Sequence, residues 1–242
     1  MKLYKYRDFY NSKFLIDILK HERIYLSYSY QFVDFFELRT NLISKSKKYS
    51  YGIVHLDNYV VASFSKKWNS APMWDKYANG FKGVCIEIEI DEKEYRIGEV
   101  IYNNKEVSMI IDEDNPNQYD GMFPLYSKED IPIESILTKK KDWSFEREVR
   151  VFEKFDHEIL LPDYYGRIWK SDSTGKFKKY HNPKHYVNGK ITKIILGPKI
   201  RDKHFKMVVE LVKNKKIPVY FISPNLFNGR FTLSKVDFKT SI

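Results

Sequence analysis

The carboxyl-terminal third of the chain carries the sequence pattern that most limits the fold. Residues 192–196, Thr-Lys-Ile-Ile-Leu, are rich in β-branched residues and end sharply at Gly197-Pro198, as is typical of a strand. Residues 201–214 then place apolar side chains at helical spacing, and residues 217–222 form a second apolar run. A strand, a helix and a strand within about 30 residues predict a right-handed parallel crossover. The fold should therefore contain at least one parallel strand pair covered by a helix.

Shorter patterns of the same kind run through the rest of the chain. The predicted strands are residues 3–7, 23–30, 59–65, 82–90, 98–102, 149–155 and 231–238, the last as an edge strand. The predicted helices besides 201–214 are residues 11–20, 37–46 and 73–78. The sequence shows neither an internal repeat nor a clear linker. We therefore expect one α+β domain over residues 1–242.

A single cysteine, Cys85, excludes an internal disulfide framework and a cysteine-based metal cluster. This cysteine content favours a reducing compartment, so we expect a cytoplasmic protein. Residues 1–7 lack the apolar segment of a secretory leader. No run of about 18 apolar residues predicts a membrane span. We expect no membrane association and assign no metal ligands.

Charge is divided unevenly along the chain. Residues 1–138 carry 18 basic and 21 acidic side chains, whereas residues 139–242 carry 24 basic and 11 acidic side chains. A basic half favours an acidic partner, with nucleic acid the first candidate. Many of the lysines are scattered, however, so ordinary lysine-rich solubility explains the same composition.

The segment 141–150, Lys-Asp-Trp-Ser-Phe-Glu-Arg-Glu-Val-Arg, brings two carboxylates close together. Glu146 and Glu148 are two positions apart, so on a strand both would project from the same face. Charged side chains in an apolar context either form ion pairs or have a functional role. Surface salt bridges with Arg147 and Arg150 are one interpretation of the segment, and a catalytic carboxylate pair is the other.

Over nearly its whole length the chain resembles a bacterial family catalogued only as a domain of unknown function. Members of that family are often found near mobile elements and phage-defence loci. The ordered motifs behind the resemblance are Tyr4-Lys5-Tyr6-Arg7, Phe64-Ser65, Met73-Trp74-x-x-Tyr77-Ala78, Lys82-Gly83-Val84-Cys85-Ile86-Glu87 and Trp143-x-x-Glu146-x-Glu148-Val149-Arg150. The family commonly has Asn-Asp-Pro after the second strand, where this chain has residues 31–36, Gln-Phe-Val-Asp-Phe-Phe. Because the two segments differ, the role of this loop is left open.

The chain also resembles ADP-ribosyltransferases in the order of a few polar residues. Those enzymes place an arginine or histidine on the first strand, serines or a tyrosine on a middle strand and a glutamate on a late strand. Here Arg7, Ser63 with Ser65, and Glu146-x-Glu148 occur in that order. The resemblance implies a split or mixed β-sheet core with peripheral helices, and it implies NAD as the cofactor.

The same resemblance implies roles for individual residues. Glu148 would stabilise the positive charge that develops on the ribose when the nicotinamide bond breaks. Glu146 would orient or deprotonate the acceptor. Arg7 would bind a cofactor phosphate. Ser63 or Ser65 would hydrogen-bond the nicotinamide side or support the glutamate.

Aromatic residues near these positions complete the predicted cofactor site. Tyr77 or Trp74 could stack on the nicotinamide ring, and Tyr6 adjoins Arg7 on the first strand. Aromatic residues at such spacings are more often packed in a core or at its rim. Both interpretations stay open at the level of sequence.

Three functions are compatible with these observations. The first is an ADP-ribosyltransferase-like toxin or phage-defence effector that modifies a macromolecular acceptor, either a protein or a nucleic acid such as RNA. The second is a non-catalytic protein that binds nucleic acid or an antitoxin-like partner at a defence or toxin–antitoxin locus. A Mg²⁺-dependent nuclease ranks last, because the carboxylates match no nuclease motif.

Overall fold

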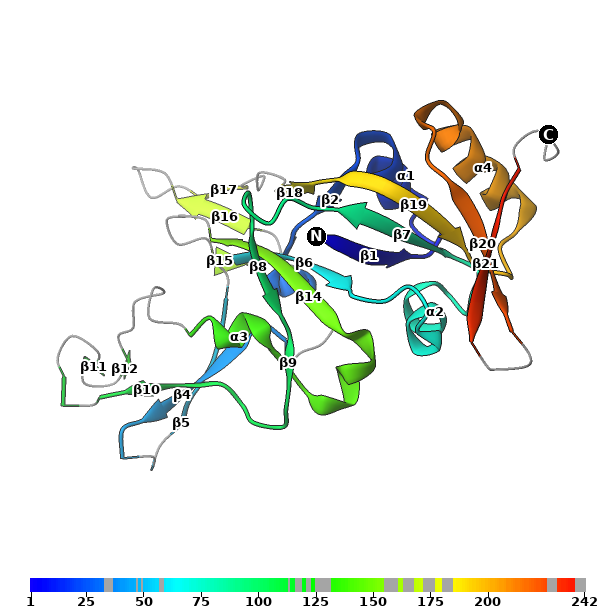
Figure 1. Ribbon diagram of the computed structural model, residues 1–242. Helices are drawn as coiled ribbons and strands as arrows, with labels where there is room; N and C mark the ends of the chain where they lie inside the picture. Colours follow the sequence, from blue (N-terminus) through cyan, green and yellow to red (C-terminus); the bar gives the residue numbers. More distant parts are fainter. Residues whose placement is uncertain are drawn as a thin grey trace.

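A nine-stranded mixed sheet forms the centre of the molecule in this computed structural model (Figure 1). The structure describes residues 1–32, 37–46, 48, 50–56, 59–112, 114–115, 119–120, 123–124, 132–154, 161–162, 168–171, 177–179, 185–225 and 230–237. Along the sheet the strands are β21 (Phe231–Lys235), β20 (Val219–Pro224), β19 (Lys190–Leu196), β7 (Val84–Glu89), β1 (Lys2–Arg7), β6 (Tyr59–Ser65), β14 (Glu148–Lys154) and β8 (Arg96–Glu99). The ninth strand, β3 (Ser27–Tyr28), pairs with β6.

The predicted crossover is present at one end of this sheet. Strands β19 and β20 are parallel, and the helix α4 (Asp202–Val212) connects them. The other strand pairs in the sheet are antiparallel. Strand β21 is the outer strand next to β20, which confirms the predicted edge. The fold is therefore a single α+β domain with a mixed sheet and few helices.

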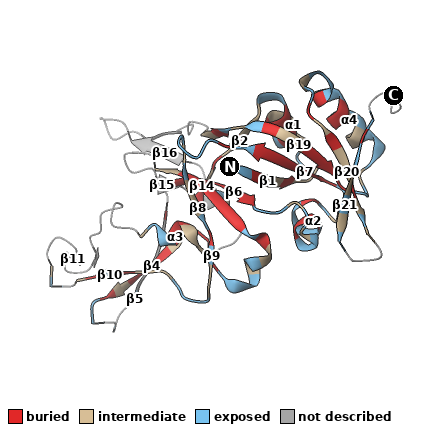
Figure 2. Cartoon of the chain, viewed as in Figure 1, coloured by how far each residue is buried: buried red, intermediate tan, exposed pale blue. Residues whose placement is uncertain are grey.

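Helices cover the two faces of the sheet unequally. On one face, α1 (Ser12–His21) and α4 pack against alternate strand residues such as Leu3 and Ile86. On the other face, the short helix α2 (Ala71–Tyr77) packs against Tyr6 and Cys85, which project from the opposite side of the same two strands. The residue alternation of each strand thus supplies both cores, and the buried residues follow the central strands in Figure 2.

Smaller elements surround the main sheet. They are β4 (Arg39–Ser44) with β5 (Ser50–His55) and β10 (Ser108–Ile111); β2 (Arg23–Tyr25) with β18 (Tyr186–Asn188); β9 (Ile101–Tyr102) with β13 (Thr138–Lys139); β11 (Tyr119–Asp120) with β12 (Phe123–Pro124); and β15 (Leu161–Pro162), β16 (Ile168–Ser171) and β17 (Phe177–Lys179). The remaining helical turns are η1 (Ser29–Gln31), α3 (Glu134–Leu137), η2 (Lys141–Glu146) and η3 (Lys213–Lys215).

The helix predicted over residues 37–46 is wrong. Residues 39–44 form strand β4, in which Thr40, Leu42 and Ser44 are buried and their neighbours are half-buried. This alternation has a period of two, which fits a strand with one face against the molecule. The strand is held on both sides, by β5 and by β10.

The main sheet is split between β1 and β6. These strands are joined by one pair of opposite residues, Tyr4 and Ser65. Farther along, β6 pairs instead with β3, through Val61 and Val60. Between these two pairings the carbonyl oxygen of Ser63 accepts a hydrogen bond from Nζ of Lys5 at 2.5 Å. A side chain thus takes the place of a strand partner where the sheet opens.

Candidate active site

A cavity of about 790 Å³ lies at the split between β1 and β6. Its walls come mainly from β1, β6, α2, η2 and the start of β14, which are far apart in the sequence. The described residues that line it are Tyr4, Lys5, Tyr6, Arg7, Tyr25, Ser27, Gln31, Phe32, Glu37, Val61, Ala62, Ser63, Phe64, Ser65, Met73, Lys76, Tyr77, Lys139, Lys140, Trp143, Glu146 and Glu148. The split therefore creates a concave site in the middle of the sheet.

Glu148 is buried at the start of β14 and forms the anionic centre of the site. Nε of Arg150 donates to its Oε1 at 2.8 Å, and Nζ of Lys139 lies 3.3 Å from its Oε2. Burial alone would raise the pKa of this carboxyl, but Arg150, Lys139 and a hydrogen bond from Ser63 lower the pKa to about 2. Glu148 is therefore ionised at neutral pH.

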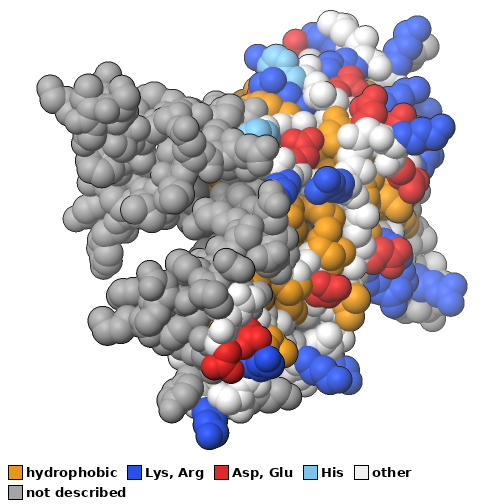
Figure 3. All heavy atoms as spheres, turned by 90° about the vertical axis from the view of Figure 1, so that its left-hand side faces the viewer, with side chains coloured by type: hydrophobic (Ala, Val, Ile, Leu, Met, Phe, Trp, Pro, Cys, Tyr) orange, Lys and Arg blue, Asp and Glu red, His pale blue; other side chains and the backbone are white. Residues whose placement is uncertain are grey.

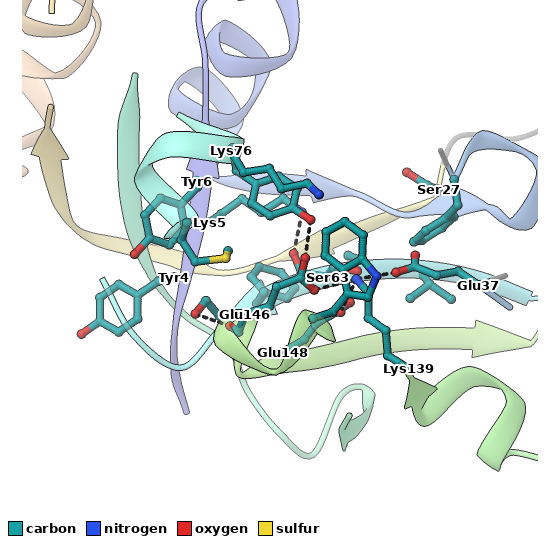
Figure 4. A pocket seen from close by; sticks show the side chains of 18 of the residues that line it. Tyr4, Lys5, Tyr6, Ser27, Glu37, Ser63, Lys76, Lys139, Glu146 and Glu148 are labelled. Carbon is teal, nitrogen blue, oxygen red and sulfur yellow. Dashed lines mark hydrogen bonds and ion pairs between the residues drawn. The ribbon is translucent and has the colours of Figure 1, made fainter. Parts of the chain in front are cut away.

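Lys139 on β13 joins three carboxylates at once (Figure 4). It pairs with Glu37, lies 2.6 Å from Oε2 of Glu146 and also contacts Glu148. All four side chains are buried. Burial would lower the pKa of the lysine, but the three carboxylates together raise it. Lys139 therefore remains a cation inside the protein.

Arg150 completes this network and does not itself line the cavity. Its side chain is fully buried, and its Nη1 donates to the carbonyl oxygen of Ile136 at 2.5 Å. Its Nη2 lies 3.4 Å from Oε1 of Glu37. We call the five residues Glu37, Lys139, Glu146, Glu148 and Arg150 the buried charge cluster. With every group ionised, the cluster carries one more negative than positive charge.

Glu146 reaches the cavity by a different route from the one predicted. It ends the turn η2, and Arg147 then adopts a left-handed conformation with φ of 45° before β14 begins. The expectation of two carboxylates alternating along one strand is therefore wrong, although both face the same cavity. Ser65 fixes this turn, because its Oγ donates to the carbonyl oxygen of Glu146 at 2.7 Å.

The carboxyl of Glu146 behaves oppositely to that of Glu148. Burial raises its pKa, and the nearby charge of Glu148 raises it further, although Lys139 and Tyr77 oppose the shift. Tyr77 donates its hydroxyl proton to Oε1 of Glu146. Of the carboxylates whose pKa is shifted in the cluster, Glu146 is thus the one that takes up a proton more readily.

Seven of the eight residues singled out from the sequence line the cavity: Tyr6, Arg7, Ser63, Ser65, Tyr77, Glu146 and Glu148. The eighth, Trp74, does not. Its ring is fully buried between Tyr6 and Phe81, and its Nε1 donates to the carbonyl oxygen of Trp68 at 2.7 Å. Trp74 therefore packs in the core and does not line the cavity, so the predicted stacking role is corrected to a core role.

Sequence reasoning missed Lys5, Glu37, Lys76, Lys139 and Trp143 as lining residues. Nζ of Lys76 lies 3.3 Å from the centre of the Trp143 ring, so these two side chains form one wall. Lys139 opens a run of three lysines, which resembles a solvated surface segment. A strand of two residues beside β9 instead turns this first lysine inward. Only its burial distinguishes it from its neighbours.

The arrangement can stabilise a positive charge that develops in a bound ligand. A carboxylate that is ionised and a second one that more readily holds a proton lie within reach of one amine. Among the described residues, no group of three or more His, Cys, Asp or Glu side chains is placed to hold a metal ion. None of the described helices is long and apolar enough to cross a membrane.

The fold and cavity define the chain as an α+β protein with a charged pocket in a split sheet. The model of a family described as a protein of unknown function (DUF2971) matches residues 73–151. The match extends from α2 to β14 and includes Tyr77, Lys139 and both glutamates, but not β1 or β6. No curated protein and no solved structure matches the chain.

Proposed function

We propose that the protein is an ADP-ribosyltransferase-like enzyme that uses NAD to modify a macromolecular acceptor, as a toxin or phage-defence effector. The observation that carries this proposal is the shared cavity. Arg7 on β1, Ser63 on β6 and Glu148 on β14 come from distant parts of the sequence and line one pocket. The acceptor is a protein or a nucleic acid, for which the basic carboxyl-terminal half favours RNA.

The reaction breaks the bond between the nicotinamide nitrogen and ribose carbon 1′. Nicotinamide leaves with the bonding electron pair, and the ribose gains oxocarbenium character. Glu148 is suited to stabilise that cation because its low pKa keeps it ionised. The acceptor atom then bonds to carbon 1′ and gives up its proton. Glu146, whose pKa is raised, is the group suited to receive that proton.

The positions of these groups also depend on side chains that hold them by hydrogen bonds. Ser65 holds the backbone of Glu146, and Tyr77 holds its carboxyl. Arg150 holds the carboxyl of Glu148 by two contacts, at 2.8 and 3.4 Å. These are positioning residues, and they fix the separation of the two carboxylates.

Purified protein incubated with labelled NAD and a panel of RNA, DNA and protein acceptors tests the proposal. We expect nicotinamide release and label transfer, reduced about 100-fold or more in Glu148→Gln, as for loss of a group that stabilises transition-state charge. Glu89→Gln is the matched control, because this glutamate is exposed on β7 and outside the cavity. Absence of NAD cleavage and transfer across the whole panel would refute the proposed reaction.

A non-catalytic binding protein is the second candidate. It is favoured because the charged side chains of the buried charge cluster already pair with one another. Glu148 already has two cationic partners, which is how a structural ion pair is satisfied. Among the described residues on the face shown in Figure 3, Lys and Arg side chains are interspersed with Asp and Glu. Binding to RNA that weakens steeply with salt and survives Glu146→Gln with Glu148→Gln would favour this candidate.

A further inference from the structure

The split in the sheet brings two cations to the wall of the cavity without a carboxylate partner. Lys5 and Arg7 are adjacent same-face residues of β1. Neither forms an ion pair with any of the residues that the structure describes. Nζ of Lys5 donates to the Ser63 carbonyl, and Nε of Arg7 is buried without a hydrogen-bond partner among the described residues. A buried guanidinium nitrogen without an acceptor is costly unless a ligand supplies one.

This end of the cavity contrasts with the buried charge cluster. Lys139 and Arg150 are both saturated by carboxylates. Lys5 and Arg7 instead repel each other, and this repulsion adds to burial in lowering the pKa of Lys5. Burial also lowers the pKa of Arg7. The protein keeps these two basic side chains side by side without a direct ion pair to any described carboxylate.

The charges of the whole lining point to the same kind of ligand. Five described basic side chains and three described acidic side chains line the cavity, which leaves a formal excess of two positive charges. An arginine fork donates hydrogen bonds to two phosphate oxygens at once, and a lysine adds a point charge. A compact group with two or more negative charges would satisfy both β1 cations.

We propose that Lys5 and Arg7 form the anion-binding end of the cavity, and that this end takes the diphosphate group of a small nucleotide-type ligand. The inference deepens the proposed function, because it adds Lys5 to the site and fixes where the diphosphate of the cofactor lies. It places that group on β1, on the wall formed by Lys5 and Arg7.

Inorganic pyrophosphate tests this site without any reaction. Binding is measured by calorimetry for the wild type, Lys5→Met, Arg7→Met and Lys2→Met. Loss of either charge-assisted contact should weaken binding about tenfold or more. Lys2→Met is the matched control, because Lys2 lies on the same strand, is exposed and does not line the cavity. It should change the affinity less than about twofold.

The pH dependence provides a signature that a purely structural lysine would not give. Lys5 is charged below its lowered pKa, so its contribution to anion binding should fade as pH rises. The other charged groups acting on it are Arg7, Glu146 and Glu148, of which the glutamates oppose the shift. The ratio of wild-type to Lys5→Met affinity should therefore fall with rising pH.

Several outcomes would overturn the inference. They are no pyrophosphate binding by the wild type, equal binding by folded Lys5→Met, and a single-stranded oligonucleotide that displaces pyrophosphate at a lower concentration than ADP does. Lys5→Gln retains an N–H donor for Ser63 and removes the charge, so it serves if Lys5→Met does not fold. Pyrophosphate binding through Lys5 and Arg7 without NAD cleavage would retain this site and reject the proposed reaction. NAD cleavage without pyrophosphate binding through Lys5 and Arg7 would retain the proposed reaction and reject this site.

Discussion

Lys139 shows how a single buried side chain can hold a site together. Its amine is the common partner of Glu37, Glu146 and Glu148, and it comes from a two-residue strand that pairs with β9. Without it, three buried carboxylates would share one arginine. Removing one partner from a buried ion pair leaves uncompensated charge, which is far more costly than losing a surface contact.

We expect Lys139→Met to reduce the free energy of unfolding by about 3–5 kcal/mol at neutral pH, because it leaves buried carboxylates without their cation. The loss should shrink in acid, where those carboxylates take up protons. Urea denaturation at several pH values measures both effects. The adjacent Lys140→Met is the control, because Lys140 is exposed and should change stability by less than about 0.5 kcal/mol. Equal losses from the two substitutions would contradict the role of Lys139.

The candidate site was only partly accessible from sequence for reasons visible in particular residues. Glu146 and Glu148 could be selected because two carboxylates stand beside a strand pattern, and Arg7 because its place on the first strand matches the residue order of ADP-ribosyltransferases. The partnership of Glu37 with Lys139 could not, since 102 positions separate them and no periodicity links them. Lys5 was passed over because alternating aromatic and basic residues resemble an ordinary strand with one solvated face.

At the scale of elements, regular patterns predicted regular structure. The runs at β6, β7 and β19 and the periodic helix α4 were found because burial imposes a period of two or about 3.6 residues. The turn η2 was missed because it depends on the left-handed backbone of Arg147. A non-glycine residue gives little sequence signal for that conformation. Strand β4 was taken for a helix because charged and apolar residues alternate irregularly around it.

The contact between α2 and β1 depends on Gly83, which precedes β7. A Cβ at this position would overlap the carbonyl oxygen of Arg7 and lie 2.9 Å from Cα of Ala78. Both of these neighbours are backbone atoms, which cannot move aside as a flexible side chain can. The glycine therefore sets how closely β7 and α2 approach the strand that bears the two cavity cations.

We expect Gly83→Ala to lower the free energy of unfolding by about 1–3 kcal/mol, as for overpacking of a close contact. Gly80→Ala is the comparison, because the nearest atom there would be 3.8 Å away and the cost arises only from a φ of 61°. That cost should be about 1 kcal/mol. Thermal unfolding of both variants measures the difference. A smaller loss for Gly83→Ala than for Gly80→Ala would show that the backbones can separate.

For the whole molecule, the two cavity glutamates link stability to pH in opposite directions. The folded pKa of Glu148 is lowered from 4.5 to about 2. Its stabilising contribution is therefore present above pH 4.5 and is lost as pH falls through about 2. The folded pKa of Glu146 is raised, so its ionisation opposes folding as pH rises above its ordinary value. Acid should thus remove the stabilising contribution of ionised Glu148 and the destabilising contribution of ionised Glu146.

We expect Glu148→Gln to destabilise the protein at neutral pH by roughly 3 kcal/mol, from a pKa difference worth about 1.4 kcal/mol for each unit. The deficit should narrow as pH falls from 4.5 towards about 2, where the wild-type carboxylate also takes up its proton. Glu146→Gln should be nearly neutral or stabilising at neutral pH, because it removes the charge that burial disfavours. Urea unfolding of the wild type and both variants over this range measures how the stability loss of each variant depends on pH.

Parallel curves for the two variants would mean that Lys139 and Arg150 do not distinguish the carboxylates. Divergent curves would show that the buried charge cluster divides them into a fixed anion and a proton acceptor, which the proposed chemistry requires.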